Sequence, residues 1–137
     1  MNESLEQARI LLLRAGDDAF MMRRLLEHPE SPYWGIGFHA QQAAEKAIKA
    51  VLAAHQVVFP FTHDLKLLLN LLKRNNISPP PEQNEITALI PYGALLRYDE
   101  VLDDNEAKEL NPQRLSRVIQ EVLEWADKLV DKGDPHV

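Results

Sequence analysis

The 137-residue chain contains no cysteine, and only 7% of its residues are aromatic. The lack of cysteine excludes disulfide bonds, thiolate nucleophiles and cysteine-ligated zinc, and it agrees with a reducing compartment. No run of residues approaches the roughly 20 apolar residues that a membrane-spanning helix requires. The N-terminal residues also lack the basic start and apolar segment of a secretory signal. We therefore expect a soluble, cytoplasmic protein that makes no membrane contact.

Several motifs for common chemistry are also missing. The sequence has no glycine-rich phosphate loop, no dinucleotide-binding glycine pattern and no HExxH zinc motif. Its five histidines are scattered without the spacing of metal ligands. We therefore expect neither a metal nor a cofactor.

The balance of charge limits the ligands that the chain can bind. Asp and Glu number 21 and Lys and Arg number 15, which gives a formal net charge of −6. General nucleic-acid binding depends on Lys and Arg meeting phosphates, so an acidic chain needs a local basic patch or a basic partner. Apolar residues (45%) and charged residues (26%) are in globular proportions, and the length fits one domain over residues 1–137.

Apolar residues recur every three or four positions between proline-rich boundaries. This pattern predicts helices over roughly 3–27 and 34–55, a third between Asp64 and Asn75, a fourth over 82–98 with a kink or break at Pro91, and a last one from Pro112. No segment alternates long enough to be a strand. The predicted fold is all-α, an antiparallel up-and-down four-helix bundle with an additional short or broken helix.

Two helix starts carry capping signals. Thr62 is predicted to be the N-cap of the third helix, with Asp64 in its first turn. Asn111 is predicted to cap the last helix, with Pro112 at the first helical position.

The second helix carries the most informative polar residues. His39, Gln42, Lys46 and Lys49 follow helical spacing, and this stripe of an imidazole, an amide and two cations is able to hold a phosphate or a base edge. The alternative is an ordinary solvated face. Glu45 stands four residues before Lys49, the favourable order for an ion pair.

Two further positions have both functional and structural interpretations. His63 precedes the third helix, where free backbone N–H groups receive anions, but a capping turn or a bond to a carbonyl explains it equally well. Arg97 can fork onto a phosphate or carboxylate, and Tyr98 can stack on a base or donate its hydroxyl. The alternative is a local ion pair between Arg97 and Asp99 that fixes the helix end.

Three segments, in this order, resemble the HEPN domain family. They are FHAQQAAEKAIKA at 38–50, THDL at 62–65 and LRY at 96–98. The resemblance spans the whole chain and implies a helical bundle that commonly forms a homodimer. It also implies a small protein often encoded beside a minimal nucleotidyltransferase, the two acting as a toxin–antitoxin pair. Nucleotides or RNA are the ligands that such a resemblance implies.

Many family members are ribonucleases that need no metal and use an Arg-x4-6-His motif, with two copies meeting across the dimer. Arg97 matches the arginine, but Leu102, Asp103 and Asp104 occupy the positions of the histidine. A nuclease without a metal needs a general acid or base, and histidine is the usual one. We therefore expect the ribonuclease motif to be absent.

Three hypotheses follow, in order of preference. The first is a non-catalytic protein that binds a nucleotide or a nucleotidyltransferase partner. The second is a metal-independent ribonuclease toxin with a displaced catalytic histidine, supplied by His39 or His63. The third is a structural homodimer without a ligand, in which the polar stripe is merely solvated.

Overall fold

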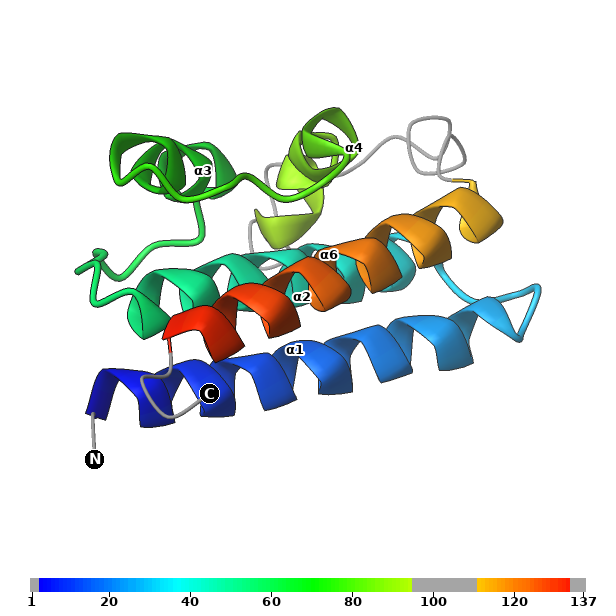
Figure 1. The fold of residues 1–137 in the computed structure, drawn as a ribbon. Coiled ribbons are helices and arrows are strands. Elements are labelled where there is room, and N and C mark those ends of the chain that lie inside the picture. The colour runs from blue at the N-terminus through cyan, green and yellow to red at the C-terminus, as the bar shows by residue number, and fades with distance from the viewer. Residues whose placement is uncertain (1–2, 95–110, 134–137) are drawn as a thin grey trace.

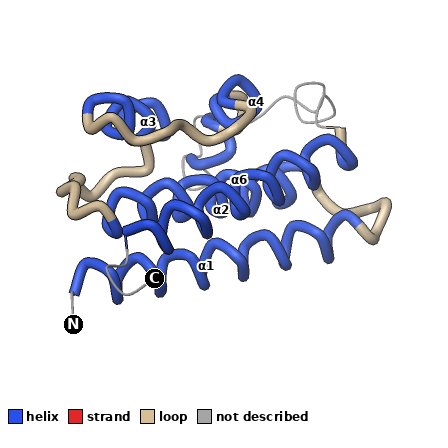
Figure 2. The backbone as a smooth tube through the Cα atoms, viewed as in Figure 1, coloured by secondary structure: helices blue, strands red, loops and turns tan. Residues whose placement is uncertain are grey.

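The computed structural model describes residues 3–94 and 111–133 of the chain. This part is all-α and contains no strand (Figures 1 and 2). Its elements are α1 (Glu3–Leu26), α2 (Tyr33–Ala54), α3 (Leu65–Arg74), α4 (Gln83–Thr87), the 3-10 helix η1 (Ile90–Ala94) and α6 (Pro112–Gly133). The predicted fold class is confirmed. No helix in the described ranges is long and apolar enough to cross a membrane.

The three long helices lie side by side, and the shorter elements cover one side of them (Figure 1). The chain runs in one direction along α1 and in the opposite direction along α2 and α6, and it returns through α3, α4 and η1. An ion pair of 3.7 Å joins Arg9, in the first half of α1, to Asp131, near the end of α6. The four segments therefore alternate in direction as in an up-and-down bundle, and the third segment is not one long helix but the short elements α3, α4 and η1.

The returning element breaks between Thr87 and Ile90, just before the proline that the sequence singles out, and Pro91 itself lies in η1. Pro91 has no backbone N–H, so it cannot donate to the carbonyl of Thr87, where α4 ends. The chain continues as the 3-10 turn of η1. The rest of the predicted fourth helix, residues 95–98, lies outside the described residues.

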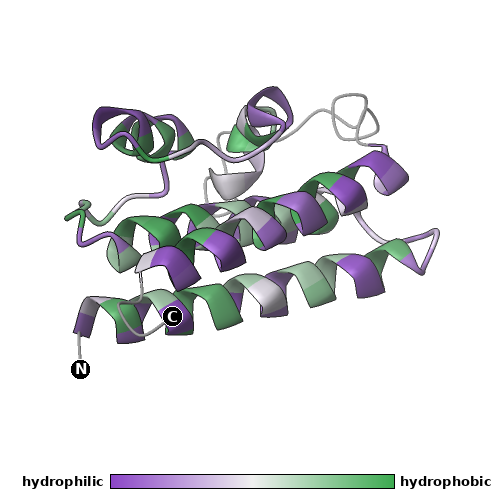
Figure 3. Ribbon diagram, in the orientation of Figure 1, coloured by the Kyte–Doolittle hydropathy of each residue, from purple (hydrophilic) through white to green (hydrophobic). Residues whose placement is uncertain are grey.

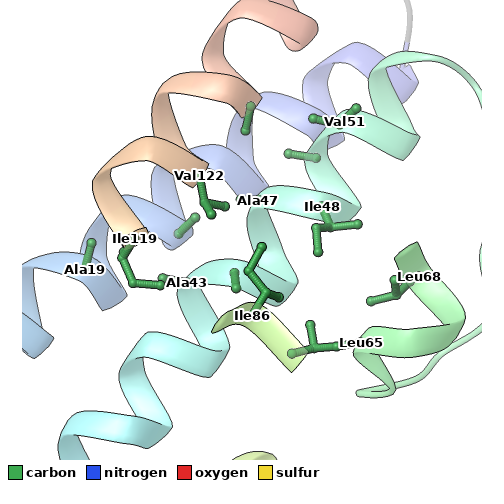
Figure 4. Packing of buried hydrophobic residues seen from close by; sticks show 14 of the residues in the cluster. Ala19, Ala43, Ala47, Ile48, Val51, Leu65, Leu68, Ile86, Ile119 and Val122 are labelled. Atoms are coloured by element: carbon green, nitrogen blue, oxygen red, sulfur yellow. The ribbon is translucent and has the colours of Figure 1, made fainter. Parts of the chain in front are cut away.

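Helix α2 forms the centre of the core because small side chains let its neighbours approach closely. Most of its residues are buried, and seven of the buried ones are alanines. Figure 4 shows α1 and α6 on one side of α2 and α3 and α4 on the other. The labelled residues are Ala43, Ala47, Ile48 and Val51 of α2, Ala19 of α1, Ile119 and Val122 of α6, Leu65 and Leu68 of α3, and Ile86 of α4.

One of the two predicted caps is wrong. Asp64 is the N-cap of α3, and its carboxylate accepts hydrogen bonds from the N–H groups of Lys66 (3.0 Å) and Leu67 (3.3 Å). Thr62 stands two residues too early to reach those donors, and its hydroxyl accepts from the N–H of Asp64 instead (3.1 Å). The cap at Asn111 is confirmed, since its side-chain oxygen accepts from the N–H of Arg114 at 3.0 Å.

A cluster of like charges on α6 gives a first testable prediction. Asp127 is largely exposed, but its partial desolvation raises the pKa of its carboxyl, and the nearby Asp131 and Glu124 carboxylates raise it further. A raised folded-state pKa means that the folded protein favours the protonated carboxyl. This group therefore stabilises the fold at a pH below its unfolded-state pKa, and that stabilisation is lost as pH rises through its folded-state pKa. Asp127→Asn should therefore raise Tm at pH 7 by about 1–3 °C, a small effect because charge interactions at the surface contribute little to stability.

The control for this prediction is Glu30→Gln, which removes one negative charge from an exposed turn and should leave Tm unchanged. The advantage of Asp127→Asn should also shrink as pH falls, because the wild-type carboxyl then becomes protonated. Thermal melts between pH 4 and pH 7 measure both effects. An advantage that grows towards acid pH would show that the charge cluster does not act as described.

Candidate functional site

A carboxylate from α1 organises two polar residues of α2. The Asp18 side chain is only 6% exposed, and its two oxygens lie 2.9 Å from Nδ1 of His39 and 2.5 Å from Nζ of Lys46. The side chains of His39 and Lys46 are 23% and 28% exposed, so both still reach solvent. We call these three residues the Asp18 cluster. It fixes an imidazole and an ammonium group two helical turns apart.

A second carboxylate organises the side of α2 that faces α3. Glu45 is buried, and its oxygens lie 3.2 Å from Nε2 of Gln41, 3.1 Å from Nζ of Lys49 and 3.1 Å from Nδ1 of His63. Lys49 is nearly buried, whereas the His63 side chain is 58% exposed. We call these four residues the Glu45 cluster. Each buried charge has an opposite charge or a donor beside it, as a charge in a low-dielectric interior requires.

The 3-10 helix η1 packs against α2 next to the Glu45 cluster. A Cβ atom added at Gly37 of α2 would lie 2.2 Å from the ring of Tyr92, which is itself buried. A Cβ atom at Gly93 would lie 3.0 Å from the side chain of Gln41. Gly37 is therefore required by close approach, Gly93 lies in tight contact with the Gln41 side chain, and η1 lies over the Gln41 end of the cluster.

The predicted stripe divides between two neighbours. His39 and Lys46 belong to the Asp18 cluster and Lys49 belongs to the Glu45 cluster, while Gln42 donates to the side-chain oxygen of Gln41 at 2.7 Å. The four residues thus sit on adjoining parts of α2 rather than in one shared contact.

Other predicted site residues have clear outcomes. The predicted ion pair between Glu45 and Lys49 is confirmed at 3.1 Å. His63 bonds to the Glu45 carboxylate rather than to a carbonyl. Arg97 and Tyr98 lie outside the described residues. No group of three or more potential metal ligands occurs in the part of the chain that the structure describes.

Three polar residues organise the site, and of these only Glu45 was expected to form a contact, its ion pair with Lys49; Asp18 and Gln41 were not predicted. All three are buried. The sequence did carry a signal, because Asp18 interrupts the apolar stripe of α1 next to Ala19, and Glu45 follows Ala44 on an apolar face of α2. A carboxylate at a core position needs a cationic or donor partner, so it marks a polar cluster.

The expectation that the ribonuclease spacing is absent requires a correction. Arg23 and His28 are separated by four residues, so the spacing does occur in the sequence. They lie in the last turn of α1 and in the turn that follows it, and both are exposed. The resemblance places the motif's arginine at Arg97 instead, where the histidine positions hold Leu102, Asp103 and Asp104.

The site's chemistry rests on its two carboxylate–imidazole pairs. A carboxylate beside Nδ1 orients the ring and selects the tautomer that carries a proton on Nδ1, so that Nε2 points away from the carboxylate. His63 presents such a ring largely to solvent, and His39 does so in part. Lys46 shares the Asp18 carboxylate with His39, so these two groups can contact an anion and a hydrogen-bond donor of one ligand.

The comparisons with known proteins agree with the resemblance. The model of the family described as the HEPN domain matches residues 8–129. No curated protein and no solved structure matches the chain. The family match covers most of the sequence, and it includes all of α2, α3, α4 and η1 and most of α1 and α6. The chain belongs to the HEPN domain family.

Proposed function

We propose that this HEPN protein binds without catalysing a reaction, and that its ligand is a nucleotide or a nucleotidyltransferase partner. Family membership associates the chain with nucleotide- or RNA-related functions. The observation that carries the proposal is the polar surface of α2, where two buried carboxylates hold His39, Lys46 and His63 in place while leaving part of each side chain in solvent.

The two clusters carry less negative charge than the chain as a whole, so they are better suited to an anionic ligand. Asp18 and Glu45 are balanced by Lys46 and Lys49, so the two clusters together are neutral when the imidazoles are neutral. Protonation of either imidazole makes them positive, whereas the whole chain carries −6. A phosphate therefore meets no net repulsion here, and it gains a charge-assisted bond from Lys46.

The residues around Arg97 do not favour catalysis. No histidine follows Arg97 at the required spacing, and acidic residues at Asp103 and Asp104 repel phosphate. Arg97 and Tyr98 remain proposed contacts for the ligand or the partner. The net negative charge of the chain favours a protein partner over free RNA. We propose that this partner is a minimal nucleotidyltransferase in a toxin–antitoxin pair, and that the chain itself forms a homodimer.

Nucleotide binding is tested by thermal shift and calorimetry with ATP and GTP. A ligand present at 100 times its Kd should stabilise the protein by about 2.7 kcal/mol. Lys46→Gln should weaken binding about fivefold or more, because it removes the most exposed cation of the Asp18 cluster. Asp18→Asn should lower Tm and yet keep or tighten nucleotide binding, since it removes a negative charge beside Lys46 and His39.

Lys128→Gln is the matched control, because it removes a positive charge from the exposed surface of α6. Equal losses of affinity in Lys46→Gln and Lys128→Gln would show that only net charge matters. The partner is tested by co-purification with a nucleotidyltransferase encoded beside this chain. If no nucleotide shifts Tm and no such enzyme co-purifies, the protein is better described as a structural homodimer without a ligand.

A second candidate function is favoured by one observation, the pair of His63 and Glu45. A largely exposed imidazole held by a buried carboxylate is a suitable general base, and a metal-independent ribonuclease needs one. This alternative predicts RNA cleavage in excess chelator that is lost in His63→Ala. Cleavage lost in His28→Ala instead would assign the reaction to the Arg23–His28 spacing at the end of α1.

A further inference from the structure

The outer face of α3 is basic, although the chain as a whole is acidic. Helix α3 contains Lys66, Lys73 and Arg74 and no Asp or Glu. Within residues 3–94 and 111–133, no carboxylate forms an ion pair with any of these three cations, which are all exposed. The carboxylate of Asp64, at the start of the helix, is used by backbone N–H groups.

Helical geometry places these cations on one side. Leu65, Leu68 and Leu72 form the buried stripe of α3. Lys66 and Lys73 stand seven residues apart, so they share one face about 10 Å apart along the axis. Figure 3 shows the hydrophilic and hydrophobic sides of α3 in contrasting colours. The cations therefore form a row that faces away from the core.

This row borders an open groove with a volume of about 950 Å³. Lys66, Lys73 and Arg74 line it together with Asn70, Ile77 and Pro79. Cations next to amide and apolar groups can meet the phosphates and the sugars or bases of one extended chain.

An exposed aromatic ring stands just before the basic row. Phe61 is 98% exposed, and its only ring contact among the described residues is edge-on with His63, at 5.9 Å between centroids. Pro60 restricts the backbone before it, and the bond from the N–H of Asp64 to the Thr62 hydroxyl fixes the turn after it. The ring is thus presented to solvent on a constrained loop, which suits stacking against an unpaired base.

We propose that the outer face of α3 binds single-stranded nucleic acid. Lys66, Lys73 and Arg74 contact its phosphates, and Phe61 stacks on a base. A basic groove that follows the backbone, combined with an aromatic stacking platform, is how single strands are held without sequence readout. The exposed aromatic favours this ligand over an acidic protein, which would engage the cations alone. The site is separate from the Asp18 cluster, so it stands whether or not the proposed function is correct.

The test is fluorescence anisotropy with a labelled 12-nucleotide single strand, as RNA and as DNA of the same sequence. The first variant is Lys66→Gln/Lys73→Gln/Arg74→Gln, and the second is Phe61→Ala. The control is Arg14→Gln/Lys128→Gln/Lys132→Gln, which removes the same number of positive charges from exposed positions of α1 and α6. Circular dichroism shows that each variant is folded, which is expected since all these side chains are exposed or at a helix end.

The first variant should bind at least tenfold more weakly at low salt, and its slope of log affinity against log salt should fall by about two, because three phosphate contacts are lost. Phe61→Ala should weaken binding about fivefold or more without changing that slope. The control should keep more than half of the affinity. Tighter binding of RNA or of DNA identifies the strand and supports the proposal either way.

Three results would overturn the proposal. The first is no binding of either strand by the wild-type protein at low salt. The second is an equal loss in the α3 variant and in the control. The third is binding of poly-glutamate as tightly as the strand with no effect of Phe61→Ala, which would assign the basic row to an acidic protein. Loss of ATP binding in Lys46→Gln with normal strand binding would separate this site from the α2 surface.

Discussion

Replacing Glu45 with alanine is expected to destabilise the protein by about 3–5 kcal/mol, the cost of leaving a buried charge without its partner. The Lys49 side chain is only 10% exposed, and Glu45 is the only carboxylate paired with its ammonium group within the described ranges. The same substitution also removes the acceptor of Gln41 and of His63. Urea unfolding followed by circular dichroism measures the change in free energy of unfolding.

The matched variant removes both charges at once. Glu45→Leu/Lys49→Met should recover most of the lost stability, because replacing a buried ion pair by apolar side chains of similar size is often neutral or stabilising. The double variant should also free the His63 ring from its carboxylate, so any anion binding that depends on a held imidazole should fall. A Glu45→Ala variant within 1 kcal/mol of the wild type would refute the Glu45 cluster as described.

Replacing Gly37 with alanine is expected to cost about 2–3 kcal/mol, an overpacking penalty. The new Cβ atom would lie 2.2 Å from Cδ1 of Tyr92, a distance that forces either η1 or the ring to move. Since Tyr92 is buried and η1 covers Gln41, the change should also loosen the Glu45 cluster. Hydrogen exchange of the η1 amides should therefore accelerate more than exchange in α1.

Gly16 provides the control within the same chain. It lies inside α1, and a Cβ atom added there meets nothing within 4 Å. Gly16→Ala should therefore stabilise the protein by about 0.5–1 kcal/mol, since alanine loses less backbone freedom in a helix. If Gly37→Ala proves as stable as Gly16→Ala, the close packing of η1 on α2 is wrong.

The long helices could be predicted from the sequence because their apolar residues repeat with helical spacing over six turns. The predicted range 3–27 ends one residue later than α1, and the predicted range 34–55 begins and ends one residue later than α2. The start of α6 could be predicted from Asn111 and Pro112 because capping depends only on residues close in sequence, here the Asn111 side chain and the N–H of Arg114. The cap of α3 was misplaced because Thr62 and Asp64 are both good capping residues, and only the backbone path decides between them.

The site was harder to predict because its key contacts join distant residues. Asp18 and Lys46 are 28 positions apart, and Glu45 and His63 are 18 positions apart. Spacing along α2 shows which residues share a face, but it does not show which neighbouring helix supplies a carboxylate. The division of the stripe between α1 and α3 is therefore a property of tertiary packing.

The proposed function requires the polar surface of α2 to bind a ligand and to leave it intact. The most direct measurement is an NMR titration of the ¹⁵N-labelled protein with ATP, GTP or a short RNA in excess chelator, with the ligand analysed afterwards. With ATP or GTP we predict amide shifts concentrated between His39 and Lys49 and at His63, with the short RNA further shifts in α3, and in every case an unchanged ligand. A cleaved ligand, or no shifts in these residues with any of the three, would contradict the account.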